Sequence, residues 1–556
     1  MKVSRRDLLI GTAGVTAGVF FTPVPWKLLG DVSIWTQNWP WIPQPPHGPV
    51  ETKQTACTLC AASCGLRVRM AEGWPVGISG VSTNPVTKGA LCPLGFAAHQ
   101  LNWHPRRLRE VRHHGYTASW TEAQSAFEKA CAEGPVAIVD GRPGRAASSV
   151  LKAFAARHKT SYRVALSSES RALTPYAIWG GVPVASLGYD LESTRTIVSF
   201  GAPLLDGWGT PGRFTRLWSE RAAGSNDPQL RLIQIEPTLS RTAARAWRWY
   251  APREGSEGTL ASAVALVLLQ EHLVSTQVPI PQVTLTDAAA QTGLSVESIR
   301  ELAHMMVERR PVLAIAPDIN PSVAALNVLL GAVGKPGGVV LRNRASASPV
   351  PFEADGGAYR AVLIDSTVPW EFVPQTNAEV FRFATWDGGG SKADWLLPSP
   401  GFLEELTDVP TAPTSAADTY NVAANLVAQS AGTISPAQFL TKIDSTLPDT
   451  EKAIHSRCEE IFKTKLGAVY ADQPTPVKEF ESAQKMEDQL RKGAVWVGEA
   501  PRAGSFHCTL KQWPATTPTA LASDWAETWA APVFPPLAAK LYQESTLREA
   551  PARRQA

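Results

Sequence analysis

Four cysteines near the amino-terminal end are spaced as metal ligands often are. Three lie close together in CTLCAASC and a fourth follows in GALCPLG, so the pattern is C-x2-C-x3-C-x27-C. These are Cys57, Cys60, Cys64 and Cys92. Thiolates bind zinc and iron–sulfur clusters, and two thiols can also join as a disulfide. The spacing helps to discriminate among these three kinds of site.

Three clustered cysteines and one distant cysteine favour a [4Fe–4S] cluster. The close trio can surround one side of a cubane while the fourth thiolate closes the cage from a separate turn. Structural zinc sites more often use two CxxC pairs, and here the second pair is missing. Disulfide frameworks are typical of small secreted domains, whereas this chain has 556 residues. Zinc and disulfides remain alternatives. The isolated Cys131, Cys458 and Cys508 are predicted to be inert thiols.

The amino-terminal residues MKVSRRDLLIGTAGVTAGVFF resemble a twin-arginine (Tat) export signal. Arg5 and Arg6 precede an apolar, Gly- and Ala-rich run that ends at Phe21. Because the Tat pathway carries folded cargo, we expect residues 1–30 to export a protein that already holds its cofactor. No clear cleavage site follows, so an uncleaved signal that serves as an anchor is an alternative. The prediction places the protein on the periplasmic side of the cytoplasmic membrane.

The composition is that of a globular protein with several domains. Hydrophobic residues make up 44% of the chain and charged residues 19%, and the net charge is +3. So small a charge gives no support for nucleic-acid binding. Residues 31–50 are rich in proline and tryptophan and are predicted to form an extended linker. LASAVALVLL (260–269) is predicted to be a buried helix, since it is too short to cross a membrane.

Short apolar segments after the cysteines predict an α/β fold with parallel sheets. The segments are PVAIVDG (135–141), RTIVSFG (195–201), RLIQIEP (231–237), VLAIAPD (312–318) and AVLIDST (361–367). Each ends in a polar or glycine turn, and helical patterns lie between them. Ligands of such folds bind beyond the carboxyl ends of the strands, where this chain has Asp140, Asp206, Glu236, Asp318 and Asp365. For each carboxylate we favour a role in capping the following helix over binding of a ribose or guanine.

The cysteine pattern, the export signal and several later segments resemble the molybdopterin oxidoreductase family. The later segments are LCPLGFAAHQLNWHPRRLREV (91–111), SWTEAQSAFEKA (119–130), TIVSFGAPLLDGWGTP (196–211), LIQIEPTLSRTAARA (232–246) and ADWLLPSPGFLEELTDVP (393–410). The opening WTQNWPWIPQPP (35–46) and the overall style of the sequence resemble the branch of molybdopterin-like subunits found in menaquinone reductase and alternative complex III, which lack molybdenum. The resemblance implies one [4Fe–4S] cluster on the four cysteines.

Departures from the family's pattern bear on function. Leu94 stands two residues after the fourth cysteine, where active members commonly carry a lysine or arginine between cluster and pterin. No cysteine lies between 131 and 458, which leaves only other ligands for molybdenum there, such as a serine of SSESRALTPY (167–176). Thr238 and REGSEG (253–258) alter the nucleotide loops. The C-terminal barrel that completes the cofactor cradle is expected to be reduced or absent.

These observations divide the chain into domains. We expect a small iron–sulfur domain at 51–115, followed by two Rossmann-like domains with doubly wound parallel sheets. The first comprises 116–175 and 305–470, and the second comprises 176–304. Residues 471–556 are predicted to be an irregular C-terminal extension.

The resemblance implies an electron-transfer subunit of a membrane-attached quinone oxidoreductase complex, with molybdopterin and molybdenum absent. The partners that it implies are a ferredoxin-like multi-cluster iron–sulfur subunit, a multihaem cytochrome c and a polysulfide-reductase-type integral membrane quinone subunit. The alternatives are a catalytic molybdenum bis-pterin oxidoreductase and a structural subunit without a working cofactor. The Pro/Trp segments 35–46 and 513–536 would suit docking to partners or wrapping over the protein's own surface.

Overall fold

The computed structural model describes residues 4–21, 49–60, 62–224, 227–275, 278–342, 358–365, 378–387, 393–412 and 414–515. The predicted linker at 31–50 lies outside these residues apart from its last two, as does 513–536 beyond its first three. The apolar run of the proposed signal forms helix α1 (Arg5–Phe21). Among the helices described, none has the length and apolarity needed to cross a membrane.

The cysteine region forms a small antiparallel sheet followed by two short helices. The strands are β1 (Val50–Ala56), β2 (Gly65–Ala71) and β3 (Trp74–Gly80), and they pair in the order β1-β2-β3. Helix α4 (Pro93–Ala97) and the 3-10 helix η1 (Ala98–Trp103) follow. Leu66, Val68 and Met70 alternate along β2 and are fully buried, as expected for a strand with one face on a core. The sheet thus supports the loops that carry the cysteines.

The first large sheet has seven strands in the order β5-β4-β16-β15-β14-β6-β7. Five strands are parallel: β16 (Trp395–Pro398), β15 (Glu379–Ala384), β14 (Ala361–Ile364), β6 (Val136–Asp140) and β7 (Ser161–Val164). β4 (Val111–His113) and β5 (Tyr116–Ala118) extend the edge in antiparallel pairing. The sheet therefore joins two segments that lie far apart in the sequence.

Four helices cover one face of this sheet. They are α5 (Trp120–Glu133), α6 (Ala146–Arg157), α14 (Pro436–Ile443) and α15 (Thr450–Thr464), and they share one core with the sheet. α5 begins at a capping box in which Ser119 and Glu122 satisfy each other's backbone N–H groups, which explains the helix predicted from SWTEAQSAFEKA. A second, smaller core lies on alternate residues of the same strands, including Val139 and Ile364.

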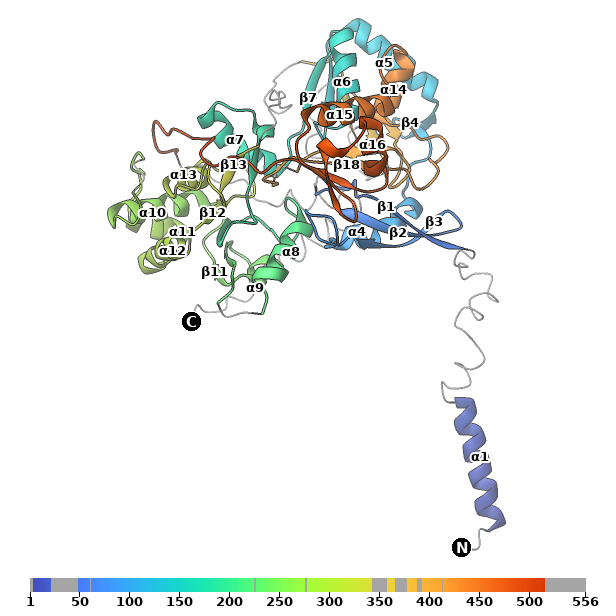
Figure 1. Cartoon of the computed structure of the whole chain (residues 1–556), viewed down its shortest axis with the longest axis horizontal. Coiled ribbons are helices and arrows are strands. Elements are labelled where there is room, and N and C mark those ends of the chain that lie inside the picture. Colours follow the sequence, from blue (N-terminus) through green and yellow to red (C-terminus); the bar gives the residue numbers. More distant parts are fainter. Residues whose placement is uncertain are drawn as a thin grey trace.

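The second large sheet is parallel, with the order β11-β10-β9-β12. Its strands are β11 (Arg248–Tyr250), β10 (Arg231–Ile235), β9 (Thr196–Phe200) and β12 (Val312–Ile315). α10 (Glu257–Gln270), α11 (Leu285–Thr292), α12 (Val296–Glu308) and α13 (Pro321–Leu329) share one core with it. α7 (Ser168–Gly180) and α8 (Pro211–Arg221) share another. The two sheets lie in separate lobes, and α8 runs from one lobe towards the cysteine region (Figure 1).

The predicted α/β fold is confirmed, but two predicted domain boundaries are wrong. All five predicted strands are present, as β6, β9, β10, β12 and β14. However, β12 pairs with β9 and not with a strand of the seven-stranded sheet, and α7 packs in the core of the four-stranded sheet. The second domain therefore extends on both sides of 176–304, from α7 to the small sheet of β8 (Leu187–Tyr189) and β13 (Val339–Leu341).

The first part of the predicted irregular extension has regular structure. β17 (Thr407–Val409), β18 (Thr419–Ala423), β21 (Val495–Val497), β19 (Ala468–Tyr470) and β20 (Pro474–Pro476) form a five-stranded sheet in that order. Its neighbouring strands pair in antiparallel fashion, and α16 (Ala483–Arg491) packs against it. The strands beyond residue 470 are only three residues long, which is too short for a recognisable alternation.

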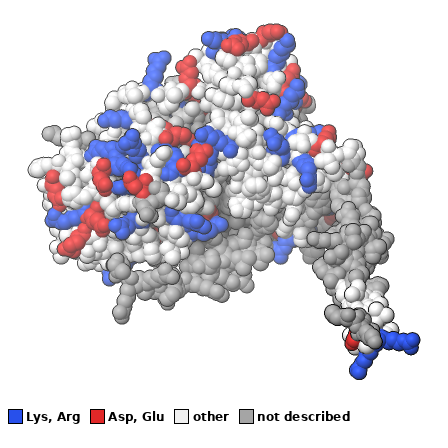
Figure 2. Space-filling view, turned by 60° about the horizontal axis from the view of Figure 1, so that its bottom comes forward, with Lys and Arg blue, Asp and Glu red and all other residues white. Residues whose placement is uncertain are grey.

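Charged side chains of both signs are interspersed on the described part of the face seen in Figure 2. This agrees with the net charge of +3. The distribution gives no sign of a single basic surface there of the kind that binds nucleic acid.

Candidate metal centre

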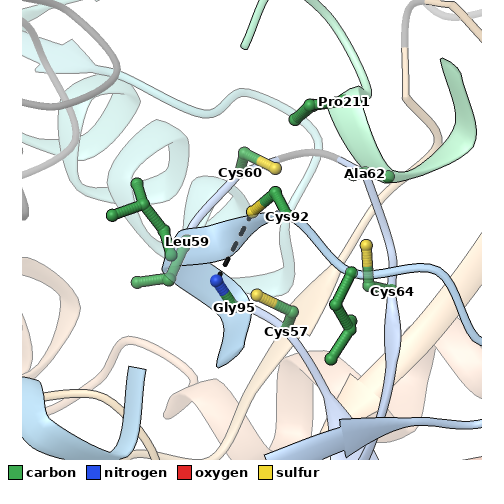
Figure 3. Close-up of a pocket in the computed structure, with 11 residues that line it drawn as sticks. Cys57, Leu59, Cys60, Ala62, Cys64, Cys92, Gly95 and Pro211 are labelled. Carbon is green, nitrogen blue, oxygen red and sulfur yellow. Dashed lines mark hydrogen bonds between the residues drawn. The ribbon is translucent and has the colours of Figure 1, made fainter. Parts of the chain in front are cut away.

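The structure brings the four predicted cysteines together around one pocket. Cys57, Cys60, Cys64 and Cys92 surround a common space (Figure 3). Cys57 and Cys64 are buried, while Cys60 and Cys92 are half-buried. The other lining residues are Leu59, Ala62, Leu91, Leu94, Gly95, Pro211 and Gly212. Cysteines that are separated in the sequence therefore converge on one pocket.

A tight turn folds the first three cysteines onto one another. The backbone N–H of Cys57 donates to the carbonyl of Cys64 at 2.8 Å. Ser63 has a φ of +54°, in the left-handed region, which lets the chain reverse before Cys64. The buried Asn84 holds this turn, because its amide donates to the carbonyl of Ser63 at 3.3 Å. These contacts of the chain with itself shape the turn that carries Cys57 and Cys64.

The fourth cysteine stands at the start of a helix. Cys92 is the N-cap residue of α4, and its Sγ accepts a hydrogen bond from the N–H of Gly95 at 3.4 Å. The N–H groups of Leu59 and Ala62 point similarly at the sulfurs of Cys57 and Cys60. N–H donors of this kind stabilise negative charge on cluster sulfurs and tune the reduction potential. The peptide backbone around the pocket suits a negatively charged group.

Free thiols would be uncharged in this pocket. Burial, together with the charge of Cys92, raises the pKa of Cys57 to about 12. The pKa values of Cys60 and Cys64 are raised in the same way, by burial first and then by the neighbouring sulfurs. The charge of Arg142 opposes the rise at Cys57 and Cys60, but it is the smaller effect. A group of iron ions would supply the positive charge that four buried thiolates need.

The donor set fits an iron–sulfur cluster better than the two alternatives. All seven cysteines are free, so no disulfide joins any of the four. The four sulfurs line a pocket, as the cage of a multi-iron cluster requires, because each thiolate binds its own iron. When bound, such a cluster supplies one-electron chemistry.

Sequence reasoning missed one wall of this pocket. Pro211 and Gly212 begin α8, which belongs to the second α/β domain, and both line the pocket. The proline at the first helical position indicates a helix start in GWGTPGRF. Nothing in that segment indicates which other part of the chain the helix faces.

The three remaining cysteines lie away from the pocket, as expected for inert thiols. Cys131 and Cys458 pack in the core beneath the seven-stranded sheet. Cys508 packs against the core that contains α7, with its Sγ 3.5 Å from the carbonyl of Tyr176. Burial raises the pKa of Cys131 to about 11 and that of Cys508 to about 12, so both stay protonated at neutral pH.

The acidic residues at the strand ends bind the protein's own groups. Asp140 accepts from the hydroxyl of Tyr162 at 2.8 Å, and both Asp140 and Asp365 pair with Arg145. Asp206 accepts from the N–H of Thr242 at 2.9 Å, in the first turn of α9 (Arg241–Arg245). Glu236 accepts from Gln234 and Ser240, and Asp318 accepts from Arg171 at 2.9 Å. These carboxylates thus take part in ion pairs and turns more than they cap the helices that follow them.

The positions that depart from the family's pattern occupy plain structural roles. Leu94 packs against the hydrophobic core that contains Cys57 and Cys64. Ser167 caps α7 by accepting from the N–H of Ser170. The hydroxyl of Ser256 donates to the carbonyl of Arg253 at 2.5 Å within REGSEG, and Thr238 is exposed.

Comparison with known proteins agrees with this site. Residues 50–102, which run from β1 to η1, match the family described as the molybdopterin oxidoreductase Fe4S4 domain. The match includes all four cysteines of the pocket.

Similar proteins of known type extend the comparison. The menaquinone reductase molybdopterin-binding-like subunit of Nitratidesulfovibrio vulgaris is 28% identical over 365 residues, which cover 61% of this chain and 52% of that protein. Nitrate reductase of Klebsiella oxytoca is 27% identical over 51% of this chain and 36% of its own. The matched regions thus span about half or less of these relatives. Acetylene hydratase from Pelobacter acetylenicus shares the fold, with a TM-score of 0.59 over 84% of this chain and 76% of its own at 12% identity.

Proposed function

We propose that this chain, a relative of the molybdopterin oxidoreductases that carries their Fe4S4 domain, is an electron-transfer subunit of a periplasmic, membrane-attached quinone oxidoreductase complex. The observation that carries the proposal is the pocket lined by Cys57, Cys60, Cys64 and Cys92. One [4Fe–4S] cluster in this pocket would accept one electron from a donor and pass it to an acceptor outside the chain. The similarity to the menaquinone reductase subunit of Nitratidesulfovibrio vulgaris supports quinone as one of the redox partners.

We further propose that the chain works without molybdenum. Leu94 occupies the pocket wall with an apolar side chain that donates no hydrogen bond to a pterin. At the strand ends, the buried Asp140 and Asp365 both pair with the half-buried Arg145, so a nucleotide would have to compete with existing ion pairs. These features favour a cluster relay over a molybdenum bis-pterin catalyst.

The remaining parts of the proposal concern location and partners. The helix with Arg5 and Arg6 at its start supports Tat-dependent export. The proposed partners are a ferredoxin-like multi-cluster subunit, a multihaem cytochrome c and a polysulfide-reductase-type membrane subunit. Purification of the chain from its native membrane, followed by identification of the proteins that remain bound, tests this part. A chain that remains in the cytoplasm, alone, would contradict it.

The cluster itself is tested with a matched pair of cysteine variants. The protein is purified without oxygen as wild type, Cys60→Ser and Cys131→Ser. Cys60→Ser is expected to lose the reducible cluster signal in EPR, since Cys60 lines the pocket. Cys131→Ser is expected to keep it, because Cys131 packs in a distant core. Equal iron content and EPR signal in the two variants would remove Cys60 from the ligand set.

Electron relay is tested by pre-steady-state reduction of the complex. A menaquinol analogue or a chemically reduced multihaem cytochrome is mixed with the oxidised complex, and the cluster is followed by freeze-quench EPR. The proposal expects the cluster of this chain to be reduced and reoxidised within one turnover of the complex. A cluster that stays in one oxidation state throughout turnover would exclude the relay function.

A further inference from the structure

The helix that closes the cysteine pocket comes from outside the Fe4S4 domain. α8 starts at Pro211 in the second α/β domain, more than a hundred residues after Cys92, and it points its N-terminal end at the pocket. Figure 3 shows Pro211 at the rim of the space that the four cysteines surround. The site is therefore assembled from two domains.

The start of α8 approaches the ligands as closely as the residue type permits. A Cβ atom added at Gly212 would lie 3.3 Å from the Sγ of Cys64 and 3.1 Å from the carbonyl oxygen of Ala90. Both distances are shorter than ordinary van der Waals contact, which for carbon begins at about 3.5 Å. A side chain at this position would push the helix away from Cys64 or push Cys64 into the pocket.

The N–H groups at the start of α8 have no acceptor within the described part of the chain. Thr210 is the N-cap residue, but its side chain makes no capping bond. Its Oγ1 lies instead 3.0 Å from the Oγ1 of Thr414, in a buried pair of hydroxyls. Neither the N–H of Gly212, which lines the pocket, nor that of Arg213, the next residue, has a hydrogen-bond acceptor among the described residues. A helix N-terminus in this state carries a partial positive charge that favours a nearby anion.

The position of α8 is fixed by buried charge pairs. Arg213 is buried, donates through Nε to Glu192 at 2.8 Å and also donates to the carbonyl of Thr414. Arg216, one turn further on, is buried too and pairs with the same carboxylate at 3.1 Å. The bonds to Glu192 hold the helix against its own domain, and the bond to Thr414 ties it to the loop between β17 and β18, so its N-terminal end is pre-positioned at Cys64.

We propose that the N-terminus of α8 is a built part of the cluster's environment and raises its reduction potential. Gly212 acts as a positioning residue that lets the helix end reach Cys64. The free N–H groups and the positive end of the helix dipole stabilise the reduced cluster, which carries one more negative charge than the oxidised cluster. The second α/β domain thereby sets the potential of a cluster whose ligands all belong to another domain. The inference rests on the proposed function only in that a cluster occupies the pocket.

The test is a redox titration of the full-length protein, followed by EPR, with two glycine variants. Gly212→Ala is compared with Gly77→Ala, a control in β3 where an added Cβ meets nothing within 4 Å. Gly212→Ala is expected to lower the ratio of reduced to oxidised cluster about threefold at a fixed applied potential, which is about 28 mV for one electron. Gly77→Ala is expected to match the wild type. A Gly212→Ala protein with wild-type potential would overturn the inference.

A second variant covers the case in which Gly212→Ala fails to retain the cluster. Thr414→Val removes the hydroxyl partner of Thr210 and exchanges a buried hydroxyl for a methyl group. The hydroxyl of Thr210 is then released to accept from the N–H groups of its own helix, which withdraws them from the cluster. We expect unchanged iron content and a lower potential, and an unchanged potential would overturn the inference. Wild-type protein without any cluster signal would refute the proposed function as well, so the two failures are distinguishable.

Discussion

Replacement of Glu404 by glutamine should loosen the Fe4S4 domain from the seven-stranded sheet. Arg107, just after η1, and Glu404, just after β16, form an ion pair at 2.5 Å in which each side chain is only 2% exposed. Glu404 also accepts from the N–H of Gly401 at 2.8 Å and from the hydroxyl of Ser430 at 2.9 Å. Glu404→Gln removes the negative charge and turns an amide NH2 towards groups that are themselves donors.

Glu404→Gln should lower the free energy of unfolding because few other groups compensate the charge of Arg107. Its Nε has no acceptor among the described residues, and its Nη1 reaches only the carbonyl of Asn102 at 3.3 Å. Loss of one partner from a buried pair destabilises a protein by about 3–5 kcal/mol, because the other charge stays buried without compensation. Since glutamine keeps one acceptor oxygen, we expect about 3 kcal/mol.

The assay is amide hydrogen exchange over η1 and over the 401–404 turn. A loss of about 3 kcal/mol should speed exchange there roughly 100-fold if these segments open together. Glu451→Gln is the control, because Glu451 pairs with Arg491 on the surface with 68% of its side chain exposed, where a pair contributes little. Arg107→Met combined with Glu404→Gln should cost less than the sum of the single changes. Exchange in Glu404→Gln no faster than in the control would refute the reasoning.

The ion pair between Arg107 and Glu404 also predicts a loss of stability at acidic pH. Burial raises the pKa of Glu404, but the hydrogen bond from Arg107, the N–H of Gly401 and the charge of Arg107 together bring it below its usual range. A carboxylate whose pKa is lower in the folded state contributes stability above its unfolded pKa, about 4.3, and loses it as the pH falls through the folded value. Exchange over the 401–404 turn, corrected for its intrinsic pH dependence, should therefore accelerate below about pH 4, and Glu404→Gln should abolish this acceleration.

Three further predictions concern other parts of the chain. Leu94→Lys places a cation at the cluster pocket, and we expect the midpoint potential measured by EPR titration to rise by about 40 mV, for an interaction of about 1 kcal/mol. Trp513→Ala removes a buried ring whose Nε1 donates to Ser262 at 3.0 Å, so the second α/β domain should lose about 3–5 kcal/mol in urea unfolding. The hydrogen bond with Glu487 raises the pKa of His455 in the folded state. The contribution of this pair to stability is therefore complete below about pH 6.5 and is lost as the pH rises through the folded-state pKa of His455. Exchange in α15, corrected for its intrinsic pH dependence, should accelerate above that pH, and His455→Gln should remove the effect.

The sequence could group the four cysteines that line the pocket because all of them belong to one domain. Cys57, Cys60 and Cys64 share a single turn, so their spacing alone constrains their geometry, and Cys92 is fixed by the short helix that it caps. Gly212 was missed because its role depends on a contact between two domains. The sequence GTPGRF indicates a helix start, but no local pattern indicates which surface that start will face.

The fold shows the same division between local and long-range information. Apolar runs bounded by turns predicted the five parallel strands, since burial on both faces leaves a local signature. The same signature fits any parallel sheet, so VLAI in β12 was assigned to the wrong one. The part of the segment 513–536 that the structure describes begins with Trp513, which packs into the protein's own core. This favours wrapping over docking at that residue.

The most direct test of the account is metal analysis together with EPR on the anaerobically purified chain and its bound partners. The proposed cluster relay predicts about four irons per chain beyond those of the partners, a reducible cubane signal that Cys60→Ser abolishes, and no molybdenum. Molybdenum in stoichiometric amount would contradict it. The chain would then be a catalytic oxidoreductase, and the roles assigned here to Leu94 and to the ion pairs at the strand ends would be wrong.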